Sequence, residues 1–151
     1  MRIALKFFQK SAVLLVFAGA ALVSACLKST EPQPSLIDLM GTWNYVGVQT
    51  GPFREDLTGT LEITSESGTS FQGQLNLTGR NTQTGETRPL NGLVSGSEKG
   101  IGVIDFDADI ESSLRRHVGQ IVVDTITGTW AGPPSGGSMA SGTFRLERES
   151  R

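Results

Sequence analysis

The feature that most constrains this chain is a glycine that recurs two residues before a bulky apolar residue. It stands in short runs that alternate apolar and polar residues, such as Leu57-x-Gly59-x-Leu61. Strict alternation is typical of a strand with one buried face. The pattern, with a glycine at or near its start or a histidine in that place, occurs in eight segments: 39–45, 57–63, 71–77, 90–94, 102–108, 117–123, 126–130 and 140–146.

Eight short strands in succession, each with an inward glycine, favour a closed sheet. Glycine weakens a strand interior, so its regular use on the inner face indicates a geometric need. Closing a small barrel demands sharply bent strands, and glycine permits the bend. We therefore predict an all-β, eight-stranded antiparallel up-and-down barrel, with a β-sandwich of the same strands as the alternative. Residues 109–116 are the best candidate for a helical turn, and residues 132–138 for a rim loop.

The first 26 residues predict export and lipidation. A basic start (Arg2, Lys6, Lys10) precedes an apolar run over residues 11–23, as in a secretory signal. The segment Val23-Ser24-Ala25-Cys26 resembles a bacterial lipobox. The resemblance implies cleavage before Cys26, a diacylglycerol on its thiol and a fatty acid such as palmitate on its amine. We predict a lipoprotein signal peptide over 1–25, a lipidated cysteine and Pro-containing tether over 26–37, and a barrel domain over 38–149.

The predicted location is the bacterial cell envelope, because several acyl chains make a durable membrane anchor. Leu27 follows the cysteine, and by analogy with enterobacterial sorting the absence of aspartate there indicates the outer membrane, with the domain facing the periplasm. The chain has 13 basic and 15 acidic residues, and three of the basic ones precede Cys26. The exported part is therefore acidic, and nucleic acid is not an expected partner.

A Gly-x-Trp on the first of eight strands, here Gly41-Thr42-Trp43, resembles the lipocalin and calycin group of barrels, and avidin-like barrels also begin with Gly-Thr-Trp. The resemblance implies a late arginine packed over Trp43, for which Arg145 and Arg148 are candidates. The chain lacks the Thr-Asp-Tyr segment that lipocalins often carry. A second Gly-Thr-Trp ends at Trp130. Strands one and seven run in the same direction, so we expect both tryptophans near the same end.

The predicted inner face is rich in large apolar side chains. An eight-stranded barrel is just wide enough to be filled by such side chains or to hold one small ligand, and both outcomes stay open. If a ligand binds, the candidate ligand-binding residues are Trp43, Tyr45, Phe106, His117, Trp130 and Phe144. The whole inward set is Trp43, Tyr45, Leu61, Ile63, Phe71, Leu75, Leu77, Val94, Ile104, Phe106, Ile121, Val123, Trp130, Phe144 and Leu146.

His117 is the only histidine, at a position that other strands give to an apolar residue or glycine. It is either a half-buried, hydrogen-bonded rim residue or a polar contact of a binding mouth. In the second case, protonation near the ordinary pKa of about 6.5 would make binding depend on pH.

Three aspartates, Asp105, Asp107 and Asp109, alternate on the outer face of one strand. The EF-hand template requires glycine and glutamate where this chain has Ile110 and Arg116, so it fails. A solvated acidic face, paired with Arg115 or Arg116, is the main interpretation, and a weak cation or basic-partner site is the alternative. No metal site is assigned.

Catalysis has little support in the sequence. The only cysteine of the exported part is Cys26, and its only histidine, the one possible histidine base, is His117. We therefore expect no enzyme activity and no cofactor. One functional hypothesis is a lipid-anchored barrel that binds a small apolar or amphipathic molecule. The other is an envelope scaffold or inhibitor module that binds another protein through its outer face and loops.

Overall fold

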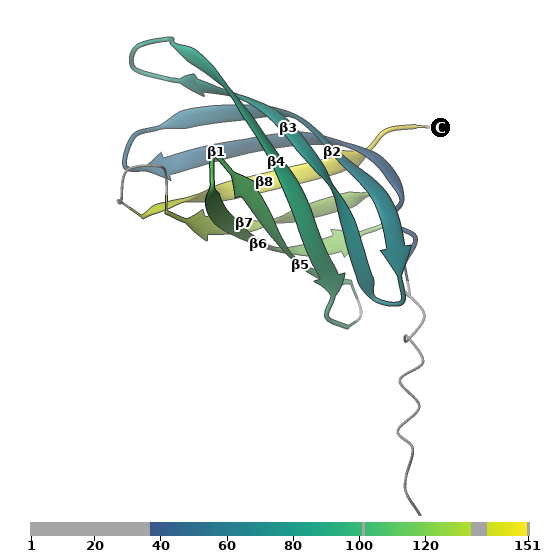
Figure 1. The fold of residues 1–151 in the computed structure, drawn as a ribbon. Coiled ribbons are helices and arrows are strands. Elements are labelled where there is room, and N and C mark those ends of the chain that lie inside the picture. The colour runs from purple at the N-terminus through teal and green to yellow at the C-terminus, as the bar shows by residue number, and fades with distance from the viewer. Residues whose placement is uncertain (1–36, 101, 134–138, 151) are drawn as a thin grey trace, which may run out of the picture. The chain divides into compact units, whose positions relative to one another are not determined.

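The computed structural model describes residues 37–100, 102–133 and 139–150, which form one closed antiparallel barrel (Figure 1). Each strand pairs with its chain neighbours, and β1 pairs with β8 to close the sheet. The up-and-down barrel is confirmed, and the sandwich is excluded. Within the described ranges no helix is long and apolar enough to cross a bilayer. The strands are β1 (Gly41–Gly51), β2 (Glu55–Ser67), β3 (Ser70–Asn81), β4 (Thr87–Glu98), β5 (Val103–Ile110), β6 (Ser113–Val122), β7 (Thr125–Gly132) and β8 (Ala140–Arg148).

Close approach between neighbouring strands explains most of the inward glycines, although a Cβ added to Gly41 would meet open space. A Cβ added to Gly142 would lie 1.8 Å from the carbonyl oxygen of Val48, and one added to Gly59 would lie 2.0 Å from that of Asn76. Both contacts are with backbone, which cannot move aside without breaking the sheet. At these points the neighbouring strand passes so close that only glycine fits.

The alternation predicts the core well. Except for Val123, every residue of the predicted inward set is buried in one cluster. Val123 is 84% exposed, so this assignment was wrong. Strand β6 ends at Val122, and Val123 has a φ of 56° in the tight turn that leads to β7. The apolar alternation continues one residue beyond the end of the strand.

The helical turn predicted over residues 109–116 is also absent. Strand β5 runs to Ile110 and β6 begins at Ser113, so Glu111 and Ser112 form a two-residue hairpin loop. Their φ values are 53° and 59°, the combination found in the tight turns that match the twist of antiparallel strands.

The two tryptophans lie toward opposite ends of the barrel. Trp43 pairs with Arg148 across β1 and β8, whereas Trp130 pairs with Gly142, which in turn faces Gln49. We call the end near Trp43, where odd-numbered strands begin, the Trp43 end. The end near Trp130 is called the Arg115 end. The expectation of a shared end was wrong because the two triplets stand at different depths: Gly41 opens β1, while Gly128 is the fourth residue of β7.

Candidate ligand site

Five of the six candidate ligand-binding residues meet inside the barrel. The ring of His117 stacks on Phe106, with centroids 4.4 Å apart, and its centroid lies 5.2 Å from that of Phe144. Trp130 and Tyr45 each lie 6.2 Å from the same ring, and Tyr45 also stacks on Phe144. We call Tyr45, Phe106, His117, Trp130 and Phe144 the aromatic cluster. Trp43 lies apart from it.

His117 is a deeply buried residue and not a half-buried residue of the rim, because only 1% of it is exposed. Its Nδ1 lies 3.0 Å from the carbonyl oxygen of Arg115, which can only accept, so Nδ1 carries the hydrogen. Nε2 is then the acceptor for the hydroxyl of Tyr45, 3.4 Å away. Burial lowers the pKa of His117 to about 4, so the ring is neutral at pH 7 and does not titrate near 6.5. Burial also raises the pKa of Tyr45, which stays protonated.

Arg115 is another inward polar residue, whereas from the sequence we expected it only as a partner of the outer acidic face. It is 2% exposed, and its guanidinium carbon lies 5.4 Å from the ring centre of Trp130. Its Nε and Nη2 have no hydrogen-bond partner among the described residues. Burial lowers the pKa of Arg115. The period of two that places His117 inside also places Arg115 inside, and this signal was available in the sequence.

Two further buried polar atoms at the same end of the barrel lack a hydrogen-bond partner in the described structure. Trp130 Nε1 and Gln49 Oε1 are buried without a partner in the described part of the chain, although Gln49 Nε2 donates to the carbonyl oxygen of Phe53. Gln49 on β1 and Trp130 on β7 each pair with Gly142 on β8. Because glycine has no side chain, β8 places none between Gln49 and Trp130 at that level. We call Gln49, Arg115 and Trp130 the polar cluster.

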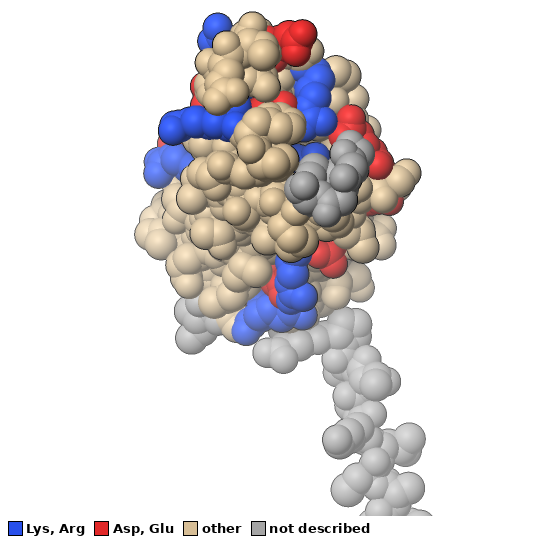
Figure 2. Space-filling view, turned by 90° about the vertical axis from the view of Figure 1, so that its left-hand side faces the viewer, with Lys and Arg blue, Asp and Glu red and all other residues tan. Residues whose placement is uncertain are grey.

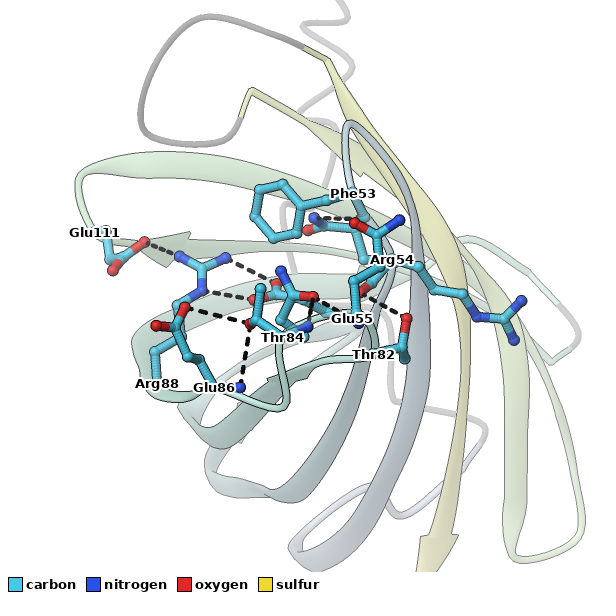
Figure 3. Close-up of polar contacts among 11 residues, drawn as sticks. Phe53, Arg54, Glu55, Thr82, Thr84, Glu86, Arg88 and Glu111 are labelled. Atoms are coloured by element: carbon cyan, nitrogen blue, oxygen red, sulfur yellow. Dashed lines mark hydrogen bonds and ion pairs between the residues drawn. The ribbon is translucent and has the colours of Figure 1, made fainter.

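Glu55 and Glu111, two carboxylates near this end, are bound by a different arginine. Arg88 donates from Nε and Nη2 to the two oxygens of Glu55, both at 2.8 Å, and from Nη1 to Glu111 at 3.2 Å (Figure 3). Glu55 is itself 2% exposed. The hydrogen bonds to Glu55, together with the negative charges of Glu55 and Glu111, raise the pKa of Arg88. Arg115 is therefore left without an anionic hydrogen-bond partner in the structure that is described.

The mouth of the Arg115 end is hollowed next to this ion pair. Phe53, Glu55 and Arg88 line a depression of about 400 Å³ together with Asn81, Glu86 and Thr87. The ring of Phe53 also lies 5.8 Å from the Arg88 guanidinium. Figure 2 faces this end and shows basic and acidic side chains side by side on it. The mouth thus offers an apolar ring and an ion pair at the same end as the polar cluster, to which Phe53 is linked by its hydrogen bond with Gln49.

Trp43 belongs to a fully bonded arrangement at the opposite end. The guanidinium carbon of Arg148 lies 4.4 Å from the Trp43 ring centre, and Arg148 donates to the carbonyl oxygens of Met40 and Asp38 and to Asp124. Trp43 Nε1 donates to the carbonyl oxygen of Leu39 at 2.9 Å. Arg148 is thus the late arginine that the lipocalin resemblance implies. Arg145 is exposed and pairs with Glu147.

The remaining candidates lie on the outer face or beyond the described ranges. Asp105 accepts a hydrogen bond from Arg116, as the acidic-face interpretation expects, whereas Arg115 points inward. Within the described residues no group of three or more His, Cys, Asp or Glu side chains is placed to hold a metal ion. Cys26 and the predicted signal and tether up to residue 36 lie outside those residues.

Comparison with known proteins supports the fold. No protein-family model matches the chain, and no curated protein matches it. Among solved structures, EF1p2_mFAP2b bound to DFHBI is similar with a TM-score of 0.61 and 14% identity, over 74% of this chain and 94% of that one. A de novo designed fluorescence-activating β-barrel has a TM-score of 0.52 and 18% identity, over 73% and 93%. The S-type phycobiliprotein lyase of Guillardia theta has a TM-score of 0.52 and 7% identity, over 75% and 89%.

Proposed function

We propose that this protein is a lipid-anchored barrel of the bacterial envelope that binds a small amphipathic molecule at its Arg115 end. The observation that carries the proposal is the polar cluster, where Arg115, Trp130 and Gln49 leave buried polar atoms without partners. Each such atom costs about 1–3 kcal/mol, more when the group is charged. A ligand that supplied the missing bonds would remove this cost.

The surroundings of the polar cluster fit a binding site. Small-molecule sites combine apolar walls with a few convergent polar groups that fix the ligand's orientation. Here the aromatic cluster adjoins Arg115 through Trp130, and Phe53 stands at the mouth. Similar barrels have been solved bound to DFHBI, which supports the view that a barrel of this size accommodates a small molecule.

The two tryptophans provide a test, because they lie at opposite ends. Trp43→Phe leaves Trp130 as the only tryptophan, and Trp130→Phe leaves Trp43. We would titrate each purified mature variant with para-bromophenylbutyramide, whose bromine quenches tryptophan at contact range. Saturable quenching of Trp130 with little quenching of Trp43 is expected. Absence of saturable quenching in both variants, with circular dichroism showing that both are folded, would overturn binding at this end.

The anchor is proposed from the signal-like segment and the lipobox-like Val23-Ser24-Ala25-Cys26. Expression of the full chain in a bacterium fed an alkyne-tagged palmitate should label the protein and place it in the membrane fraction. Cys26→Ser should abolish both label and membrane association, and Ser24→Ala should preserve both. Labelling that persists in Cys26→Ser would contradict lipidation at this residue.

A second candidate function is binding of an envelope protein at the outer face. Leu93 and Leu114 are 74% and 59% exposed and line a depression of about 480 Å³ over β2 to β6. Photo-crosslinking from position 93 in cells should then capture one reproducible partner, whereas crosslinking from position 46, at exposed Val46, should not. Equal or no capture from both positions would rule against this function.

A further inference from the structure

The geometry points to a specific ligand chemistry: the donors of Arg115 and Trp130 in the polar cluster bind a carboxylate, which enters the barrel first and is held by Nε and Nη2 of Arg115. This inference rests on the proposed binding function and adds the ligand class and its orientation. It starts from one fact, that a buried guanidinium has one edge without hydrogen-bond partners among the described residues.

The same chain shows what such an edge binds. Nε and Nη2 form one side of the guanidinium, and their N–H bonds are nearly parallel, which matches the two oxygens of a carboxylate. In Arg88 this edge donates to both oxygens of Glu55 at 2.8 Å. In Arg115 the same two atoms are buried and unpaired. A ligand carboxylate would make at Arg115 the two bonds that Glu55 makes at Arg88.

The protein's own carboxylates do not take this place. Glu55 and Glu111 are the acidic groups whose charge acts most on Arg115, and both are bound by Arg88. Arg115 is therefore a positive charge buried without a paired anion, an arrangement that is costly unless a counter-ion joins it. Trp130 Nε1 adds a further donor on the neighbouring strand, which again favours an acceptor-rich, anionic group.

The packing of the lumen sets the orientation. Beyond Arg115 the interior is occupied by His117, Phe106 and Phe144, whose ring centroids lie 4.4 to 5.8 Å apart. A long tail cannot pass these closely packed rings. The carboxylate is therefore the innermost part of the ligand, and its apolar part extends outward toward the mouth and Phe53. Short aryl or alkyl carboxylates fit this description.

A matched pair of probes tests the inference. Para-bromophenylbutyrate and its neutral amide differ only in the head group, and their dissociation constants would be measured by titration calorimetry with the mature protein. Wild type should bind the carboxylate at least tenfold more tightly, because only the carboxylate makes a charge-assisted pair of hydrogen bonds with Arg115. Arg115→Met should abolish this preference and leave amide binding within about threefold.

Two further variants define the controls. Arg115→Lys keeps the charge but not the two-nitrogen edge and should retain only part of the preference. Arg145→Met removes an exposed outer arginine of equal charge and should change nothing. Equal affinity of wild type for both probes, or equal weakening of both by Arg115→Met, would overturn the carboxylate inference and leave the binding function standing. Failure of wild type to bind either probe would count against both.

Discussion

The two ends of the barrel each place an arginine over a tryptophan, yet the two pairs differ in how their hydrogen bonds are made. At the Trp43 end, every nitrogen of Arg148 donates to a backbone carbonyl or to Asp124, and Trp43 donates to Leu39. At the Arg115 end, two nitrogens of Arg115 and the indole nitrogen of Trp130 are buried without partners in the described residues.

The difference lies in whether a segment of backbone passes over the arginine–tryptophan pair. Residues 38–40 run past the Trp43 end and present their carbonyl oxygens to Arg148 and Trp43. No described segment does this at the Arg115 end. An arginine whose donors are all accepted serves stability, whereas a buried arginine with unpaired donors calls for a separate explanation, for which we have proposed a ligand. The following predictions test that contrast.

Loss of Trp43 should have the largest effect. Trp43→Ala removes a fully buried side chain, its bond to Leu39 and the surface on which Arg148 packs. We expect the free energy of unfolding to fall by about 3–5 kcal/mol in urea titrations, as for other buried large-to-small changes. A loss below about 1 kcal/mol would show that this end contributes little to stability.

Acid should destabilise the protein through His117. Its folded-state pKa of about 4 lies below the ordinary 6.5, so the unfolded chain binds more protons between these values. The contribution of His117 to the free energy of unfolding is fully present above about pH 6.5. It falls toward pH 4, by about 2 kcal/mol between pH 7 and pH 5. His117→Phe keeps the stack on Phe106 and should remove this share of the slope. An unchanged slope in the variant would contradict the assignment.

The same substitution should destabilise the protein at Arg148 but not at Arg115. Arg148→Met leaves the carbonyls of Met40 and Asp38 without their donor and should destabilise the protein by about 2 kcal/mol. Arg115→Met removes an unpaired buried charge and should leave the ligand-free protein unchanged or about 1 kcal/mol more stable. Thermal and urea unfolding of both variants would decide, and equal destabilisation would remove the contrast between the ends.

The smallest effect concerns the turn next to Arg148. Val123 is a β-branched residue with a φ of 56°, beside Asp124, which accepts from Arg148. Val123→Gly should raise the free energy of unfolding by about 1 kcal/mol, because glycine adopts this conformation without a clash. Val122→Gly, in the adjoining strand, should lower it. Stabilisation by neither variant would show that the turn holds little strain.

Much of the fold is visible in the sequence because a strand's alternation is a local property. The period of two assigned Phe106, Trp130 and Phe144 to the inside without knowledge of any pairing. It also carried the signal for Arg115, two residues before His117, which was overlooked because an arginine inside a barrel contradicts the usual composition of a core. The same alternation misled at Val123, because it contains no mark of where a strand ends.

The site depended on information that no single segment contains. His117 could be placed on the inner face, but its depth follows from the rings contributed by β1, β5 and β8. The opposite placement of Trp43 and Trp130 follows from the stagger between strands. The sequence by itself determined the strands, their inner faces and the closed sheet, since these follow from local periodicity and glycine geometry. Only the tertiary structure decided which arginine is satisfied and which is not, because hydrogen-bond partners are set by the register of strands far apart in the chain.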